Sequence, residues 1–363
     1  MKSIIKNQIV TALLFSITVL NAQSQSLNER PRNSKDIISV EFLKNIEFLG
    51  FVLHIGDTEA DYSQTFTNHP LRLFLDKKRE QLRNEESISR VFELGEELSY
   101  SLFVELFTKM DELPHNDGYE IPSELLQKYS LNTSADISLM QEIMEQVYIF
   151  YEQSEFELFW KTHQEWYKGA LKEINEIKPD NVLIDVLENF YGQQFAKYKI
   201  IPSLTFWPGP GFGFEGENIA FFVLGPFNHD LNFNNTERLK TLAIHEFGHA
   251  FANHILETSC INIIEETRPL FDPIAESMYS QSYPKWSYCV DEHFVRAGEV
   301  LIPEMMNNKS LSESNLLFNT EEKNFIYLPF IVDQLRKYRI LEGLSYEESA
   351  KKTLQDLKKK FMP

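Results

Sequence analysis

The chain has 363 residues, of which 43% are hydrophobic and 13% aromatic, so it is long enough to bury a large core. Its formal net charge is −19 at pH 7, which argues against binding to nucleic acid or to an anionic lipid surface. We therefore expect no nucleic-acid partner and attribute the acidity to solubility.

Residues 1–23 have the pattern of a secretory signal peptide. Lys2 and Lys6 give a basic start, residues 9–20 form an apolar run broken only by Thr and Ser, and Ala22 lies near the expected cleavage point. The run is too short to span a bilayer stably, and no cysteine follows it to carry a lipid anchor. The mature protein is therefore expected to be exported, secreted or periplasmic, without a membrane anchor.

Residues 24–190 are expected to form a mainly helical lobe. A short strand is predicted at residues 37–40. Apolar side chains at helical spacing then predict helices at residues 41–51, 71–82, 88–110, 123–129, 135–150 and 155–177. The last of these is rich in aromatic residues, which we expect to lie in the core.

Strand-like segments follow this lobe. Residues 200–207 and 219–224 are predicted strands, and the glycine-rich stretch at 208–216 is expected to be the hairpin turn between them. This stretch lacks the Gly-Lys-Ser/Thr that a phosphate-binding loop requires. An exposed strand just before the next helix can hold an extended peptide through main-chain hydrogen bonds.

The helix predicted at residues 236–256 carries an H-E-x-x-H motif. Side chains four residues apart on a helix point in nearly the same direction, so His245 and His249 can bind one Zn²⁺ at about 2.0–2.1 Å. Glu246 is turned by about 100° from His245, which places it beside the metal. There it can take a proton from zinc-bound water and pass it to a leaving amine. The uncharged residues around the motif favour this interpretation over a buried helix with two incidental histidines.

A catalytic zinc site needs three protein ligands and one open position. The metzincin arrangement fails, because Ala252 and Ile255 stand where it requires Gly and His. Residues 288–302 combine helical periodicity with a carboxylate in an apolar setting, and Glu292 is the expected third ligand.

Several neighbours of Glu292 leave alternatives open. Asp291 and Glu299 are alternative ligands in the same segment. Arg296 lies one turn after Glu292 and can orient its carboxylate by a charge-assisted hydrogen bond, although surface Glu–Arg pairs are also common. His293 is either a substrate contact or a surface residue.

The motif together with Glu292 resembles the gluzincin group of zinc metallopeptidases. More narrowly, the chain resembles a family of exported bacterial proteins catalogued as a domain of unknown function. The segments that carry this resemblance are Tyr62, Asn68-His69-Pro70, the aromatic helix around Phe159, the strand before the motif, and residues 291–297. The resemblance implies a zincin-like fold, one Zn²⁺ per chain and hydrolysis of a peptide or protein substrate.

One position departs from the gluzincin pattern. Many gluzincins carry an Asp four residues after the ligand Glu, where it supports a zinc-bound histidine, but this chain has Arg296 there. A supporting carboxylate must then come from elsewhere, and Asp272 and Asp291 are the candidates. Zincins also use a Tyr, His or Arg to stabilise the tetrahedral intermediate, and Tyr327 is the candidate by its placement, with a core tyrosine as the alternative.

Two features complete the chain. Cys260 and Cys289 are its two cysteines, and either a disulfide or a pair of buried thiols is compatible with an exported protein. Helices are expected at residues 330–338 and 346–361.

The expected fold is α+β, with the helical lobe at residues 24–190 and a zincin-like catalytic region at residues 191–363 in one continuous unit. The expected function is that of an exported zinc metallopeptidase. The alternatives are a catalytically inactive zincin-fold protein that binds peptides or another protein, and a metal-dependent hydrolase acting on other bonds.

Overall fold

A computed structural model of the chain describes residues 37–56, 69–95, 98–114, 121–206, 211–228 and 230–362. The segment from Ile38 to Pro363 forms one compact unit. The predicted signal peptide, Tyr62 and Asn68 lie outside the described residues. Among the helices that are described, none combines the length and apolar character needed to cross a membrane.

The N-terminal part is built around α2 (Lys44–Gly56), whose side chains are almost all buried. Phe48 and Phe51 of this helix contact Phe156, and Phe51 also contacts Phe159, which confirms the core role expected for two aromatic residues of the 155–177 segment. The other helices of this part are α3 (Pro70–Leu82), α4 (Glu86–Gly95), α5 (Tyr100–Lys109), α6 (Ser123–Lys128), α7 (Ser134–Gln153), α8 (Phe156–Thr162), α9 (Gln164–Ile177) and α10 (Asn181–Tyr191). The helix predicted at 155–177 is divided at His163, whose ψ of 17° departs from helical geometry.

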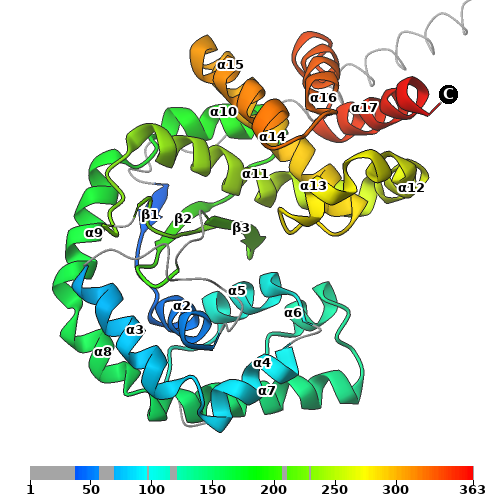
Figure 1. Ribbon diagram of the computed structural model, residues 1–363. Coiled ribbons are helices and arrows are strands. Elements are labelled where there is room, and N and C mark those ends of the chain that lie inside the picture. The colour runs from blue at the N-terminus through cyan, green and yellow to red at the C-terminus, as the bar shows by residue number, and fades with distance from the viewer. Residues whose placement is uncertain are drawn as a thin grey trace, which may run out of the picture. The chain divides into compact units, whose positions relative to one another are not determined.

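A four-stranded mixed sheet follows the order β1-β2-β4-β3. Its strands are β1 (Ile38–Val40), β2 (Lys197–Pro202), β3 (Gly211–Gly216) and β4 (Ile219–Leu224). β2 runs parallel to β1 and β4, whereas β3 pairs with β4 in the antiparallel direction. The sheet and the surrounding helices give the α+β class that the sequence predicts (Figure 1).

The glycine-rich stretch was predicted wrongly. Residues 211–216 form an edge strand and are no hairpin turn, and the strands on either side of the stretch, β2 and β4, are parallel neighbours. The turn of the actual hairpin lies at Glu217 and Asn218, whose φ angles of 50° and 62° suit a tight connection between antiparallel strands.

Two glycines let β3 lie directly against the motif helix. A Cβ atom on Gly213 would lie 1.8 Å from the main-chain oxygen of Glu246, and one on Gly211 would lie 2.6 Å from Oε1 of the same residue. Real atoms do not approach so closely, so position 213 requires glycine, whereas a Cβ atom at position 211 would displace the Glu246 carboxylate. The main chain of the edge strand therefore touches the main chain of the helix at Glu246.

The C-terminal part is organised by α11 (Thr236–Ser259) and α14 (Trp286–Met305), which pack side by side (Figure 1). The Asn235 side chain caps α11 by accepting a hydrogen bond from the main-chain N–H of Arg238. The remaining helices are α12 (Ile261–Glu266), η2 (Arg268–Ile274), α13 (Ala275–Tyr279), α15 (Lys309–Leu317), η3 (Phe318–Glu322), α16 (Leu328–Leu335), η4 (Arg336–Leu341) and α17 (Tyr346–Phe361). The last three occupy the positions of the two predicted closing helices.

Candidate metal centre

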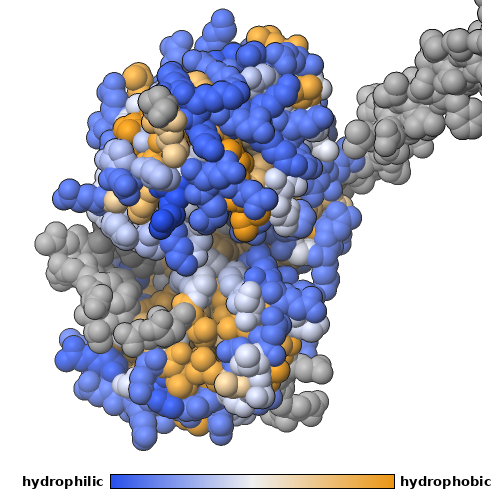
Figure 2. All heavy atoms as spheres, turned by 90° about the vertical axis from the view of Figure 1, so that its right-hand side faces the viewer, coloured by the Kyte–Doolittle hydropathy of each residue, from blue (hydrophilic) through white to orange (hydrophobic). Residues whose placement is uncertain are grey.

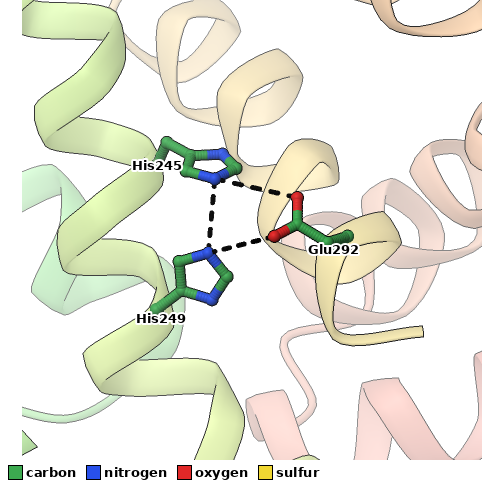
Figure 3. Close-up of side chains that lie close together, drawn as sticks. All are labelled: His245, His249 and Glu292. Carbon is green, nitrogen blue, oxygen red and sulfur yellow. Dashed lines mark hydrogen bonds and ion pairs between the residues drawn. The ribbon is translucent and has the colours of Figure 1, made fainter. Parts of the chain in front are cut away.

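The packing of α11 against α14 brings His245, His249 and Glu292 together. One ligand atom from each lies within 4.8 Å of the others, and Figure 3 shows both imidazole rings facing the carboxylate from the neighbouring helix. The two Nε2 atoms are 3.2 Å apart. Oε2 of Glu292 lies 3.7 Å from Nε2 of His245, and Oε1 lies 3.4 Å from Nε2 of His249.

These separations fit a bound metal ion. Ligand atoms placed tetrahedrally around zinc at about 2.0–2.1 Å are about 3.3–3.4 Å apart from one another. The separations of 3.2, 3.4 and 3.7 Å are similar, but the last two run to different oxygens of Glu292; with one ligand atom from each residue, all three lie within 4.8 Å of one another. The cluster could therefore hold a metal ion, and it consists of the three residues that the sequence predicts as ligands.

The outward-facing nitrogens of both histidines have partners of their own. Oε1 of Glu299 lies 2.8 Å from Nδ1 of His245, and Oδ1 of Asn253 lies 3.2 Å from Nδ1 of His249. Asn319 in turn donates a 2.7 Å hydrogen bond to Oε2 of Glu299. Such partners fix the orientation of a histidine and leave its other nitrogen available to a metal.

Glu299 thus has a different role from the one predicted. It was considered as a ligand, but it supports His245 from the side opposite the cluster. Asp272 and Asp291, the candidates for the supporting role, form no hydrogen bond with either histidine ring among the described residues.

Arg296 pairs with the carboxylate of Glu292, as an ion pair and not through the predicted charge-assisted hydrogen bond. Its guanidinium lies 3.0 Å from Oε2 of Glu292, donates to Asn319 at 2.7 Å, and stacks over the Phe325 ring at 4.5 Å. Glu292 is only 7% exposed, so the pair is not a surface ion pair. Burial by itself would raise the pKa of Glu292, but Arg296 and the two histidines bring it below its ordinary value, so the carboxylate remains charged.

The cluster attracts positive charge. Burial by itself would lower the pKa of His249, but its hydrogen bond to Glu292 and the charge of that carboxylate raise the pKa to about 9. A metal cation satisfies the same attraction and releases the proton when it binds.

Glu246 lies beside the cluster and not within it. Its side chain is 4% exposed, and Gly211 of β3 lies against its carboxylate. Burial raises the pKa of Glu246, an effect that the two histidines oppose. A carboxylate in this position can accept and deliver a proton next to the cluster.

The cluster opens into a cavity of about 1830 Å³. Its walls come from α5 and α6 on one side, α11 and α14 on the other, and β3 between them. Figure 2 views this side of the molecule, where a hollow lies between the two halves and apolar residues occupy part of its surface.

Two predicted site residues lie elsewhere. Tyr327 is 4% exposed, donates a 2.9 Å hydrogen bond to the carbonyl of Leu270, and does not line the cavity. His293 is fully buried, bonded to the carbonyl of Cys289 at 2.6 Å and packed against Phe325, so it is neither a substrate contact nor a surface residue. Both side chains belong to an aromatic cluster that supports α14.

Some residues of the site were missed. Tyr283 lines the cavity and its hydroxyl lies 3.4 Å from the Arg296 guanidinium, but it stands in a loop with no pattern to reveal it. The position of Glu299 could have been read from the sequence. It lies seven residues after Glu292, which is two helical turns along the same face. Cys260 and Cys289 are both buried free thiols, so the disulfide alternative is not formed.

A family model described as "Domain of unknown function (DUF4932)" matches residues 124–341, which is more than half of the chain. The match includes all three residues of the cluster. No curated protein and no solved structure matches the chain.

Proposed function

We propose that this chain, which belongs to the DUF4932 family, is a zinc-dependent hydrolase that cleaves peptide bonds. The observation that carries the proposal is the convergence of His245, His249 and Glu292, whose ligand atoms lie within 4.8 Å of one another, with Glu246 beside them at the wall of a large cavity. The helix pair and the edge strand around this cluster support a zincin-like arrangement of the gluzincin type.

Zinc suits the donor set of two imidazole nitrogens and one carboxylate. When bound, it would polarise a carbonyl group and lower the pKa of a water molecule. The chain would hold it through three residues that are themselves oriented by Glu299, Asn253 and Arg296. This support keeps the ligand atoms in place before the ion arrives.

Glu246 is proposed as the group that moves the proton. Its carboxylate would accept a proton from the attacking water and deliver it to the nitrogen of the leaving amine. Its position next to the cluster, on the helix turn that supplies both histidines, supports this role.

The edge strand β3 is proposed to align the substrate. Phe212, Gly213, Phe214 and Glu215 line the cavity, and β3 is the last strand of the sheet order. An edge strand offers main-chain hydrogen-bonding groups on its outer side, to which an extended peptide can add as a further strand. A peptide bound there would pass beside Glu246.

The first experiment measures metal and activity together. Wild type should bind about one zinc per chain, and His249→Ala and Glu292→Ala should each lose it. His254→Ala is the matched control, because His254 lies on the same helix outside the cluster. Glu246→Gln should keep zinc and abolish cleavage of an unfolded protein substrate. Zinc retention without cleavage in wild type would reject the peptidase, and equal cleavage by Glu246→Gln would reject the mechanism.

A further inference from the structure

The cavity continues past the metal cluster toward two more carboxylates. Asn253 and Glu257 follow His249 along α11 at spacings of four residues, so they lie on nearly the same side of the helix. Asp291 precedes Glu292 on α14. Asn253, Glu257 and Asp291 all line the cavity.

Neither carboxylate has a partner. Asp291 is 9% exposed, and within the part of the chain that the structure describes its side chain forms no hydrogen bond and no ion pair. The side chain of Glu257, which is exposed, also has no hydrogen bond or ion pair among the described residues. A carboxylate that is nine-tenths buried and unpaired is uncommon, because desolvation of its charge is normally offset by a donor or a cation.

Other carboxylates of the same cavity are compensated. Nζ of Lys128 lies 2.5 Å from Oε1 of Glu105, Arg296 pairs with Glu292, and Asn319 donates to Glu299. Lys128 thus pairs with Glu105, and its charge also acts on Glu257 without forming an ion pair with it among the described residues.

The two free carboxylates also act on each other. Asp291 is nine-tenths buried, and the negative charge of Glu257 acts on it across the same cavity wall. A positively charged group entering between them would relieve both the desolvation and the repulsion.

We propose that Asp291 and Glu257 form an acidic subsite that binds a cationic group of the substrate, either a free peptide α-ammonium or the side chain of lysine or arginine. The inference rests on the proposed function and narrows its substrate class. From His249 to Glu257 α11 rises about 12 Å, whereas each residue of an extended peptide spans about 3.3–3.6 Å. The charged group therefore lies within about four residues of the bond that is cleaved.

The test measures peptide binding to the zinc-loaded Glu246→Gln protein by calorimetry. Two peptides without other charged side chains serve as probes, one with a single lysine and one with norleucine in its place. Each is prepared with a free and with an acetylated N-terminus. The probes that carry a positive charge should bind about tenfold more tightly than the acetylated norleucine peptide, which carries none. Glu257→Gln and Asp291→Asn should each remove most of that preference.

Two controls accompany these variants. Glu237→Gln changes an exposed glutamate of the same helix that does not line the cavity, so the preference should remain. Zinc content is measured for every variant, because Asp291 adjoins the ligand Glu292 and its substitution could disturb zinc binding. Glu257 is distant from Glu292 in sequence.

The outcomes separate the inference from the function on which it rests. Tighter binding of the lysine peptides would identify the side chain as the group that the subsite binds. Tighter binding of the peptides with a free N-terminus would identify the α-ammonium instead, and either result supports the subsite. Equal binding of cationic and uncharged peptides overturns it even if wild type cleaves them. Charge-dependent binding without cleavage by wild type keeps the subsite and rejects the peptidase. A second zinc ion lost in Glu257→Gln would assign the carboxylates to a metal and overturn the inference.

Discussion

Oε1 of Glu299 lies 2.8 Å from Nδ1 of His245, while Nε2 of the same ring faces His249 and Glu292. The carboxylate therefore stands next to the ring nitrogen that faces away from the cluster, where it can support the imidazole. Asn319 donates a hydrogen bond to Glu299, and both side chains are buried. His245 is therefore supported by a buried side chain and not by solvent.

Glu299→Gln should weaken zinc binding by about 10–100-fold without abolishing it, since it removes the support and not a ligand. Competition with a chromophoric chelator measures the affinity. Glu304→Gln is a matched control on the same helix, where Glu304 pairs with Arg336. A loss of zinc as complete as in His249→Ala would show that Glu299 is a ligand.

Tyr327→Phe should leave kcat/KM unchanged, because the Tyr327 hydroxyl donates to the Leu270 carbonyl and not into the cavity. The loss of that hydrogen bond should lower the free energy of unfolding by about 1 kcal/mol. Steady-state kinetics and urea denaturation separate the two effects. A hundredfold fall in kcat at normal stability would restore the catalytic role first predicted for Tyr327.

Gly213→Ala should destabilise the protein by more than about 3 kcal/mol or prevent folding, because the new methyl group would meet the backbone of Glu246. Gly169→Ala is the control. Gly169 lies in α9 with no atom within 4 Å of an added Cβ, so alanine should stabilise by about 0.5–1 kcal/mol. Thermal unfolding of both variants tests the contrast, and a similar small effect at both positions would contradict the close packing of β3.

Acid should destabilise the fold through His54. Arg72 donates to Nδ1 of His54 at 3.3 Å, and Nε2 lies 3.2 Å from Asp76, an arrangement that fits the neutral ring. Burial, with the charges of Arg72 and Arg79, lowers the pKa of His54 from 6.5 to about 3. Below pH 6.5 the unfolded chain therefore takes up a proton that the folded chain does not, and stability falls as the pH falls toward 3.

At pH 4.5 this proton uptake lowers the free energy of unfolding by about 2–3 kcal/mol relative to pH 7. His54→Asn, which can keep an acceptor for Arg72, should be less stable at pH 7 but lose less stability between the two pH values. Urea denaturation of both proteins at pH 7 and 4.5 gives the difference. An equal loss in wild type and variant would exclude His54 as the source.

The metal cluster was predictable because its signals are local. His245 and His249 share one helical face by their spacing, and Arg296 reaches Glu292 because it lies one turn away. The mainly helical N-terminal part followed in the same way from the periodicity of its apolar residues.

Other features depend on contacts that the sequence does not express locally. The glycines of β3 have the composition of a turn, and their reason is a helix backbone some thirty residues further along the chain. His293 was misplaced because α14 is buried on nearly every side, so its periodicity distinguishes no outer face. Tyr327 was assigned by its placement in the chain, and the hydrogen bond to Leu270 that holds it in the core crosses 57 residues.

The contact between Gly213 and the backbone of Glu246 has a consequence for how this site can diversify. Since no side chain lies between Gly213 and the main chain of Glu246, two main chains set the distance between β3 and the helix at this point. Side chains elsewhere along the cavity can change and so alter which molecules enter it. The alignment of an added strand with Glu246, the residue proposed to transfer the proton, would then stay the same.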